Sequence, residues 1–297
     1  MPIDLERKLG AARFGERHVG RDADTGRELL VTRLRLDATG LDEARKARVV
    51  EAARRYQGLV HPHIATLVTA GFTRPGQLIV AQELPPGAGE APTNTATESG
   101  LETLIHLCEG LAYAHARGMV HGALTGDCVF RGGPHGTRIA DFGVGAALFE
   151  AGALARLGAR APEIAPEVKS GGEPTPAADV YALGVVGLQL CSPPRSPGAP
   201  AEEAPLSERA RRIPSIGPAT VLARAIEADP KARFATAEEM LGHLRRIASQ
   251  PPSPQPTRPV RRSPKSRVPR EPEPPSAPEM SRGRGAGLVA WALVRSL

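Results

Sequence analysis

The sequence predicts an α+β fold with a strand-rich N-terminal part and a helical C-terminal part. Three observations support this prediction. Short apolar runs bounded by turn residues dominate the chain up to residue 84, and longer segments with helical periodicity follow between residues 101 and 247. Beyond residue 250, Pro, Arg and Ser dominate the composition, so that stretch cannot bury a core. A series of strands followed by a series of helices is typical of α+β proteins.

The N-terminal part contains three strand-like runs and one helix-like segment. The strand-like runs are Glu28–Leu36, Ile64–Phe72 and Gln77–Leu84. The first of them follows the turn signal Asp24–Gly26, and a charged amphipathic pattern over 41–58 predicts a helix between the first and second. The polar stretch 85–100 has no periodicity and predicts a loop at the border with the helical part.

Four segments of the C-terminal part have helical patterns. Leu101–Arg117 places its apolar residues at the spacing of one helix face. Ala178–Cys191 is apolar nearly all round, which predicts a buried helix. Two further helices are expected over 220–228 and 236–247, the second beginning with a capping box of Thr236 and Glu239.

Composition narrows the possible functions. The formal net charge is +6, but no motif that combines aromatic and basic residues supports nucleic-acid binding. The three cysteines have neither metal nor redox spacing. The first ten residues contain no apolar run, so we expect no signal peptide and a cytoplasmic protein. Residues 250–285 are expected to form a Pro/Arg-rich linker, and the apolar end at 286–297 is too short to span a membrane, so membrane contact would be peripheral at most.

A series of motifs gives this chain a specific resemblance over residues 1–249. In chain order they are HPHI (61–64), LAYAHARGMVH (111–121), DFG (141–143), APE (165–167), DVYALGVV (179–186) and DPKARF (229–234). Their order and spacing resemble those of bacterial eukaryotic-like, or Hanks-type, Ser/Thr protein kinases. The resemblance implies a two-lobed protein-kinase-like fold, with a β-rich N-lobe at 1–84 and a helical C-lobe at 85–249. The family's activity is ATP- and Mg²⁺-dependent protein phosphorylation.

The catalytic positions that the resemblance assigns hold unsuitable residues. Thr32 stands where the family has its phosphate-binding Lys, and Ala123 stands where it has the catalytic base. Cys128 replaces a metal ligand, although Mg²⁺ prefers hard oxygen ligands. Arg33 follows Thr32 directly and should point to the opposite face of the strand. Asp127 is the one carboxylate that could serve as a displaced base, and no intact catalytic residue is expected.

The nucleotide site implied by the resemblance is altered as well. In the glycine-rich loop, Ala12 replaces the middle glycine and Arg17 replaces the Val that covers adenine. Leu30 replaces a small residue, and Gln82 adds a polar group behind the site. Weak or vestigial nucleotide contacts are therefore assigned to Gly10, Gly15, Leu30, Glu83 and Leu84. Asp141 is the remaining candidate metal ligand, and it is vestigial without its partners.

Structural residues of the family are better kept. Glu167 and Arg233 match a buried ion pair, and Asp179 matches the Asp that binds the backbone of the catalytic loop. His121 and Phe142 match residues of a hydrophobic spine. Glu51 matches the helix residue that pairs with the missing Lys, and the segment 141–167 contains no Ser, Thr or Tyr that could be phosphorylated.

These substitutions predict a pseudokinase that acts as a scaffold or allosteric partner in bacterial signalling. Loss of several catalytic groups at once, each worth roughly 10²–10⁴ in rate, is difficult to compensate. No cofactor is expected, and ATP and Mg²⁺ would bind only if residual nucleotide affinity survives. The expected partners are proteins, such as an active kinase or another signalling protein. The alternatives are a Ser/Thr kinase with residual or unorthodox activity, and a membrane-proximal adaptor that acts through the Pro/Arg-rich tail.

Overall fold

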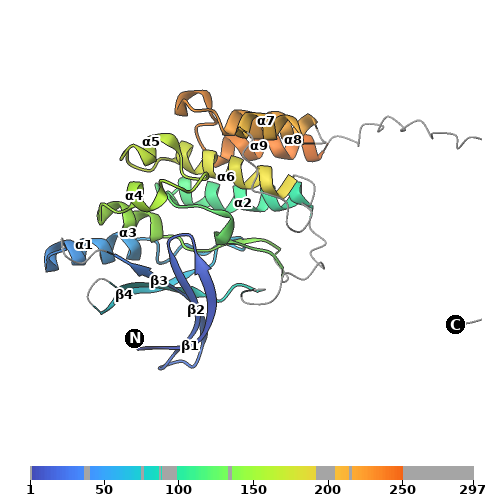
Figure 1. Cartoon of the computed structure of the whole chain (residues 1–297). Helices are drawn as coiled ribbons and strands as arrows, with labels where there is room; N and C mark the ends of the chain where they lie inside the picture. Colours follow the sequence, from blue (N-terminus) through green and yellow to red (C-terminus); the bar gives the residue numbers. More distant parts are fainter. Residues whose placement is uncertain are drawn as a thin grey trace, which may run out of the picture. The chain divides into compact units, whose positions relative to one another are not determined.

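The computed structural model of the chain (Figure 1) describes residues 2–36, 41–74, 77–86, 88, 99–132, 136–191, 205–213 and 216–249. The described residues all lie within one compact unit, residues 1–251. The expected linker at 250–285 and the apolar end at 286–297 lie outside the described residues.

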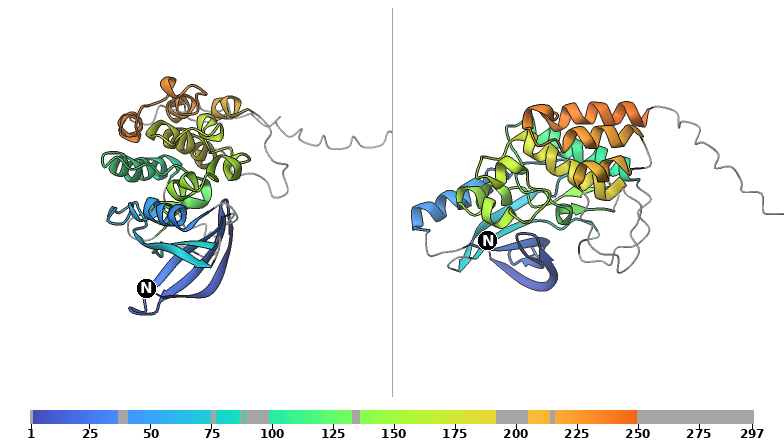
Figure 2. Two further views of the ribbon diagram at one scale, coloured as in Figure 1. Left: turned by 90° about the vertical axis from the view of Figure 1, so that its left-hand side faces the viewer. Right: turned by 45° about the horizontal axis from the view of Figure 1, so that its top comes forward.

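The N-lobe is built on a five-stranded antiparallel sheet. Its strands are β1 (Ile3–Ala12), β2 (Gly15–Asp22), β3 (Glu28–Arg35), β4 (Leu67–Arg74) and β5 (Gln77–Glu83). They lie in the order β1-β2-β3-β5-β4, so β3 is central and β1 is an edge strand. The helix α1 (Glu43–Arg54) connects β3 to β4 and packs against β4 and against the C-lobe helix α3 (Val144–Glu150), as Figure 2 shows.

Position in the sheet explains the composition of its strands. The central strand β3 buries Leu29, Leu30, Val31 and Leu34, since both of its faces are covered. The edge strand β1 exposes most of its residues and is rich in charged side chains. Charged edge strands are a common protection against pairing with other chains.

The C-lobe consists mainly of helices that pack around one buried helix. Its elements are α2 (Gly100–His115), η2 (Gly126–Cys128), β6 (Val129–Phe130), β7 (Arg138–Ile139), α3, α4 (Leu154–Gly158), α5 (Pro166–Lys169), α6 (Pro176–Cys191), α7 (Leu206–Arg211), α8 (Ile216–Ala225), η3 (Pro230–Ala232) and α9 (Ala237–Ala248). The helix α6 is buried along most of its length, in contact with α2, α8 and α9. Gly187 makes this approach possible, because a Cβ there would lie 2.5 Å from Leu222 and 2.9 Å from Leu104.

The predicted α+β class and two-lobed fold are confirmed. The expected strands and long helices are present, with ends shifted by a few residues. The predicted capping box at α9 is only half formed. Thr236 accepts a hydrogen bond from the amide of Glu239, but the Glu239 carboxylate binds the amide of Ala235 instead of that of Thr236. A complete capping box, with Ser99 and Glu102, begins α2 instead.

Candidate functional site

The candidate site lies between the lobes, around the buried carboxylate of Asp141. This residue follows β7 and precedes α3, and only 4% of its surface is exposed. Its φ of 67° is in the left-handed region, which is uncommon for a residue with a side chain. Next to it, the Phe142 ring packs against the rings of His121 and Tyr56, with centroids 4.7 and 6.2 Å apart. This packing fixes the backbone so that Asp141 faces the sheet.

Two neutral side chains of the sheet bind Asp141 from the N-lobe. The Gln82 amide donates to Oδ1 of Asp141 at 3.0 Å and accepts from the Asp141 backbone amide at 2.9 Å. The Thr32 hydroxyl donates to the same Oδ1 at 2.6 Å. Gln82 is fully buried and Thr32 nearly so, which makes both bonds inaccessible to water. Together they hold both the backbone and the side chain of Asp141.

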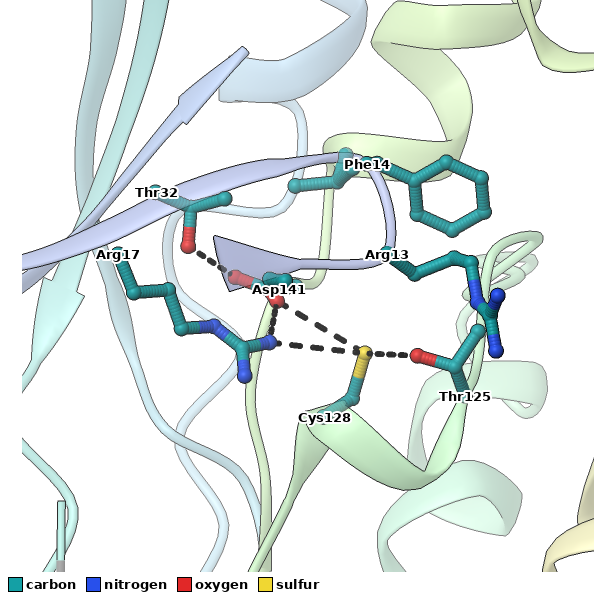
Figure 3. Close-up of a pocket in the computed structure, with 9 residues that line it drawn as sticks. Arg13, Phe14, Arg17, Thr32, Thr125, Cys128 and Asp141 are labelled. Atoms are coloured by element: carbon teal, nitrogen blue, oxygen red, sulfur yellow. Dashed lines mark hydrogen bonds and ion pairs between the residues drawn. The ribbon is translucent and has the colours of Figure 1, made fainter. Parts of the chain in front are cut away.

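Arg17 supplies a positive charge to the same carboxylate. Its Nη2 forms an ion pair with Oδ2 of Asp141, and its Nη1 donates to the backbone carbonyl of Asp127. The guanidinium also lies 5.3 Å from the centre of the Phe130 ring, within the range of a cation–π contact. Figure 3 shows the Arg17 side chain directed at the Asp141 carboxylate, with its guanidinium also facing Cys128.

Electrostatics keeps both members of this pair charged. Burial opposes the charge of Arg17, but Asp141 and the neighbouring groups outweigh it and raise the pKa of Arg17. Burial likewise opposes ionisation of Asp141, and the charge of Arg17 with the Thr32 hydrogen bond lowers the pKa of Asp141 below its ordinary value. The site therefore contains a carboxylate that is already neutralised by a residue of the chain itself.

Cys128 completes the surroundings of Asp141. Its Sγ lies 3.7 Å from Oδ2 of Asp141 and 3.5 Å from the hydroxyl of Thr125. Burial, reinforced by the negative charge of Asp141, raises the pKa of the Cys128 thiol to about 12. Cys128 is therefore a neutral thiol that donates to the carboxylate.

The hairpin between β1 and β2 closes over the site. Its turn residues are Arg13 and Phe14, and the Arg13 amide donates to the Asp127 carboxylate at 2.8 Å. At Gly15 a Cβ would lie 2.2 Å from the backbone oxygen of Arg33, so only glycine lets the hairpin approach β3 this closely. Gly10 lies at an irregularity in the β1–β2 pairing.

Little space remains beneath the hairpin. The cavity has a volume of about 10 Å³, which is room for about one water molecule. It is lined by Ala12, Arg13, Phe14, Arg17, Thr32, Thr125, Cys128, Asp141 and Val144. A metal ion could bind Asp141 only by displacing side chains of the protein, because both oxygens of Asp141 already accept hydrogen bonds.

The side of the cleft where the resemblance places adenine is also packed. Leu30 forms a buried cluster with Ala65 and Ala140, and Leu84 and Phe130 cover it. Glu83 turns away toward arginines, with carboxylate oxygens 2.7 Å from Arg27 and 3.7 Å from Arg138. Of these two expected nucleotide contacts, Leu84 therefore packs in the cluster and Glu83 pairs with arginines.

The loop that corresponds to the catalytic loop is anchored by buried groups. Asp179 accepts from the amides of His121 and Gly122 at 2.7 and 2.8 Å. His121 also bonds the carbonyl of Ala140 through Nε2 at 2.9 Å. The Ala123 methyl is buried at the position of the expected base. Asp127 is exposed, and its carboxylate accepts from the hairpin.

Glu167 and Arg233 lie together, as the resemblance implies. The Arg233 guanidinium binds both carboxylate oxygens, at 2.7 and 2.9 Å. Its remaining N–H groups donate to the carbonyls of Ala177, Glu227 and Ala228. All five donors of this buried guanidinium therefore have acceptors.

The structure corrects the role expected for Glu51. The resemblance implies that it faces the strand position now held by Thr32. The inward face of α1 is instead formed by Val49, Ala52 and Ala53, while Glu51 is exposed and borders a surface hollow with Lys46. In place of the Thr32–Glu51 approach, Thr32 binds Asp141. Arg33 does point to the other face of β3, where it pairs with Glu16.

Sequence reasoning assigned Arg17 to the adenine side of the site and missed its contact with Asp141. A signal for this contact exists in the strand register. Arg17 is the direct cross-strand neighbour of Thr32, so two polar residues share one inward-facing position among apolar ones. Because such a pair is costly to bury alone, it indicates a buried polar partner.

Comparison of the sequence with known proteins supports the resemblance to protein kinases. The sequence matches the protein tyrosine and serine/threonine kinase family over residues 3–227. The chain belongs to this family. Serine/threonine-protein kinase PknB of Mycobacterium leprae is 27% identical over 271 residues, which cover 82% of this chain and 43% of that protein. The probable serine/threonine-protein kinase PkwA of Thermomonospora curvata is 33% identical over 208 residues, which cover 66% and 27%. The chain thus spans less than half the length of these relatives.

A solved structure supports the fold. The crystal structure of the Mycobacterium tuberculosis PknI kinase domain aligns with a TM-score of 0.58 and 24% identity, covering 82% of this chain and 95% of that domain. Among the residues that the structure describes, no helix combines the length and the apolar character needed to cross a membrane.

Proposed function

We propose that this member of the protein kinase family is a pseudokinase, a protein-binding signalling component that does not transfer phosphate. The observation that carries the proposal is the ion pair between Arg17 and Asp141. A guanidinium occupies the place where a metal ion would have to bind Asp141. Thr32 and Gln82 engage the second carboxylate oxygen.

The magnitude of this interaction decides against nucleotide binding. Breaking a buried, hydrogen-bonded ion pair costs about 3–5 kcal/mol. A micromolar ligand has a binding free energy of about 8 kcal/mol, so displacing Arg17 would leave about 4 kcal/mol, which corresponds to millimolar affinity. The packed cluster around Leu30 would add a further cost. We therefore expect an affinity for ATP weaker than millimolar.

The remaining features suit a protein that presents a stable surface. Phe142 packs against His121, and Asp179 holds the neighbouring loop, so the chain's own side chains hold the centre of the fold. Residues 141–167 contain no hydroxyl side chain, so phosphorylation of Ser, Thr or Tyr cannot switch this segment. The partner we propose is another cytoplasmic signalling protein, such as an active kinase, that recognises the folded unit.

The test combines transfer and binding on the full chain. With labelled ATP and either Mg²⁺ or Mn²⁺, we expect no incorporation into the protein or into generic substrates. Calorimetry should give no ATP dissociation constant below 1 mM. An active protein kinase, handled in parallel, provides the positive control. Metal-dependent incorporation that is lost in Asp141→Asn, or a micromolar dissociation constant, would refute the proposal.

Residual kinase activity is the second candidate, because the relatives carry the names of Ser/Thr kinases. It requires Arg17 to leave Asp141 when nucleotide enters. The same experiment separates the candidates, since residual transfer would appear as incorporation that depends on metal and on Asp141.

A further inference from the structure

A second cluster of polar side chains lies apart from the Asp141 site. His63 belongs to the loop between α1 and β4, while His106 and Glu109 are one turn apart on α2. The ligand atoms that these three residues offer all lie within 4.8 Å of one another. His63 is buried, and the other two are half-buried. The cluster thus joins a loop of the N-lobe to a helix of the C-lobe.

The position of protons on His63 makes this cluster unusual. Its Nδ1 lies 2.8 Å from the carbonyl oxygen of Thr137, which can only accept, so Nδ1 carries a hydrogen. In a neutral ring, Nε2 then has a lone pair and no hydrogen. That nitrogen lies 3.1 Å from Oε2 of Glu109, which is also an acceptor. Two electron-rich atoms at this distance need a positive species between them, either a proton or a metal ion.

The two imidazole rings of the cluster lie face to face. The imidazole of His106 stacks on that of His63, with centroids 4.1 Å apart and planes inclined by 15°. Stacked rings direct their lone pairs nearly in parallel, so binding of one ion by both rings requires the half-buried His106 side chain to rotate out of the stack.

Outer contacts hold the ligand atoms in place. The bond from His63 to the Thr137 carbonyl fixes the ring so that Nε2 faces the cluster. Arg245 donates to Oε1 of Glu109 at 2.9 Å, which leaves Oε2 directed toward His63. Metal-binding histidines and carboxylates characteristically have such outer partners.

We propose that His63, His106 and Glu109 form a zinc site. Two imidazoles and one carboxylate are a ligand set that Zn²⁺ takes, with a fourth position left for water. Mg²⁺ and Ca²⁺ are disfavoured, because they prefer oxygen ligands. The bound ion would join the α1–β4 loop to α2.

The loop connects this site to the strand that precedes Asp141. The Ile139 amide donates to the carbonyl of His63 at 2.9 Å, and the Ala65 amide donates to the carbonyl of Ile139 at 2.8 Å. Asp141 follows two residues later. Zinc would therefore stabilise the connection between the lobes, which we expect to appear as a higher melting temperature.

The test titrates the chelator-treated full chain with Zn²⁺ against a chromophoric indicator. We expect one ion per chain with a dissociation constant below 1 μM, and at least a tenfold loss of affinity in both His106→Gln and Glu109→Gln. The control is His243→Gln, which removes a half-buried histidine of α9 outside the cluster and should leave affinity unchanged. Substitution with Co²⁺ should give the visible absorption of a site with low coordination number.

Three results would overturn the proposal. One is affinity in His106→Gln and Glu109→Gln equal to that of the native chain. Another is loss of affinity in His243→Gln to the same extent, which would indicate scattered surface binding. The third is the absence of tight binding together with a stability that falls as pH rises through neutrality and loses this dependence in Glu109→Gln. That result would assign the cluster to a protonated His63 paired with Glu109.

Discussion

At the scale of single residues, Arg17 supplies a positive charge at the Asp141 site, where the family's Lys is missing. The resemblance places a Lys at position 32 of β3, and the chain has Thr there. Arg17, the cross-strand neighbour on β2, brings its charge to the same carboxylate. The loss of Lys at position 32 is thus matched by the presence of Arg at position 17. Asp141 remains ionised and buried. Because Arg17 belongs to the chain, it neutralises Asp141 without a bound metal ion or nucleotide. The stability of the site therefore does not depend on nucleotide binding.

The first prediction concerns Arg17→Ala. Removal of the guanidinium leaves Asp141 as a buried carboxylate without a counter-charge, and we expect a loss of about 3–5 kcal/mol in the free energy of unfolding at pH 7. The matched control is Arg33→Ala, on the same sheet. Arg33 pairs with Glu16 in a more exposed position, so its removal should cost less than about 1 kcal/mol. Urea denaturation measures both.

The pH dependence of this loss has a definite sign. In the native protein the pKa of Asp141 is lowered, so its contribution to stability is present above the unfolded value near 4 and is lost as pH falls through the folded value. In Arg17→Ala the largest cause that lowers the pKa of Asp141 is gone, so burial outweighs the remaining Thr32 hydrogen bond and raises that pKa. The variant should therefore gain stability as pH falls from 7 to 4.5, and the gap to the native protein should narrow. An equal gap at both pH values, or no recovery at pH 7 by the added change Asp141→Asn, would contradict this assignment.

Sequence reasoning could locate the residues of the site but not their contacts. The motif order places Asp141, His121 and Asp179 correctly, because these positions are tied to segments with strong patterns. The direction of Arg17 depends on how closely the hairpin approaches the C-lobe, which no local pattern encodes. The position of Glu51 depends on the rotation of α1 about its axis, and a charged helix with a weak apolar face leaves that rotation undetermined.

At the scale of elements, the sequence predicted those helices and strands whose buried face repeats apolar residues at regular spacing. The central strands β3 and β5 and the helices α2, α6 and α9 have inward faces that the sequence reveals. The edge strand β1 is exposed along most of its length, so it has no apolar alternation to detect. The short helix α3 begins directly after the left-handed Gly143, in the segment 141–167, for which the sequence predicted no helix.

The second prediction concerns the anchoring of α5 by Arg233. Arg233→Ala removes a guanidinium whose five N–H groups are all bonded, and it leaves Glu167 without its partner. We expect a loss of about 3–5 kcal/mol in the free energy of unfolding. Arg233→Lys should recover little of this loss, because one ammonium cannot replace two parallel bonds to Glu167 and three to carbonyls.

The control for this prediction is Arg224→Ala. Arg224 is a neighbouring arginine whose side chain is 42% exposed and pairs with Glu239. Its removal should cost about 1 kcal/mol or less. Denaturation midpoints of the three variants provide the comparison, and a midpoint for Arg233→Ala no lower than that for Arg224→Ala would show that the buried pair does not anchor the segment.

At the scale of the whole folded unit, the cleft residues connect the lobes. Arg17, Thr32 and Gln82 come from three strands of the N-lobe, and all three bind Asp141 of the C-lobe. A kinase that binds nucleotide needs the lobes to separate for entry and release. In this chain, hydrogen bonds and an ion pair between side chains join the two lobes directly. The arrangement favours one closed state that persists without ligand.

The last prediction is that the two lobes open as a single cooperative unit. Native-state amide exchange should give the slowest amides of β3 and α6 the same opening free energy, equal to that of global unfolding. In Arg17→Ala the connection is weakened, so the amides of β3 should open at a lower free energy than those of α6, while Arg33→Ala should keep them equal. If β3 already opens well before α6 in the native protein, the bonds across the cleft do not couple the lobes. Arg17 would then not lock the cleft against nucleotide, since a sheet that opens freely would release Asp141 at little cost.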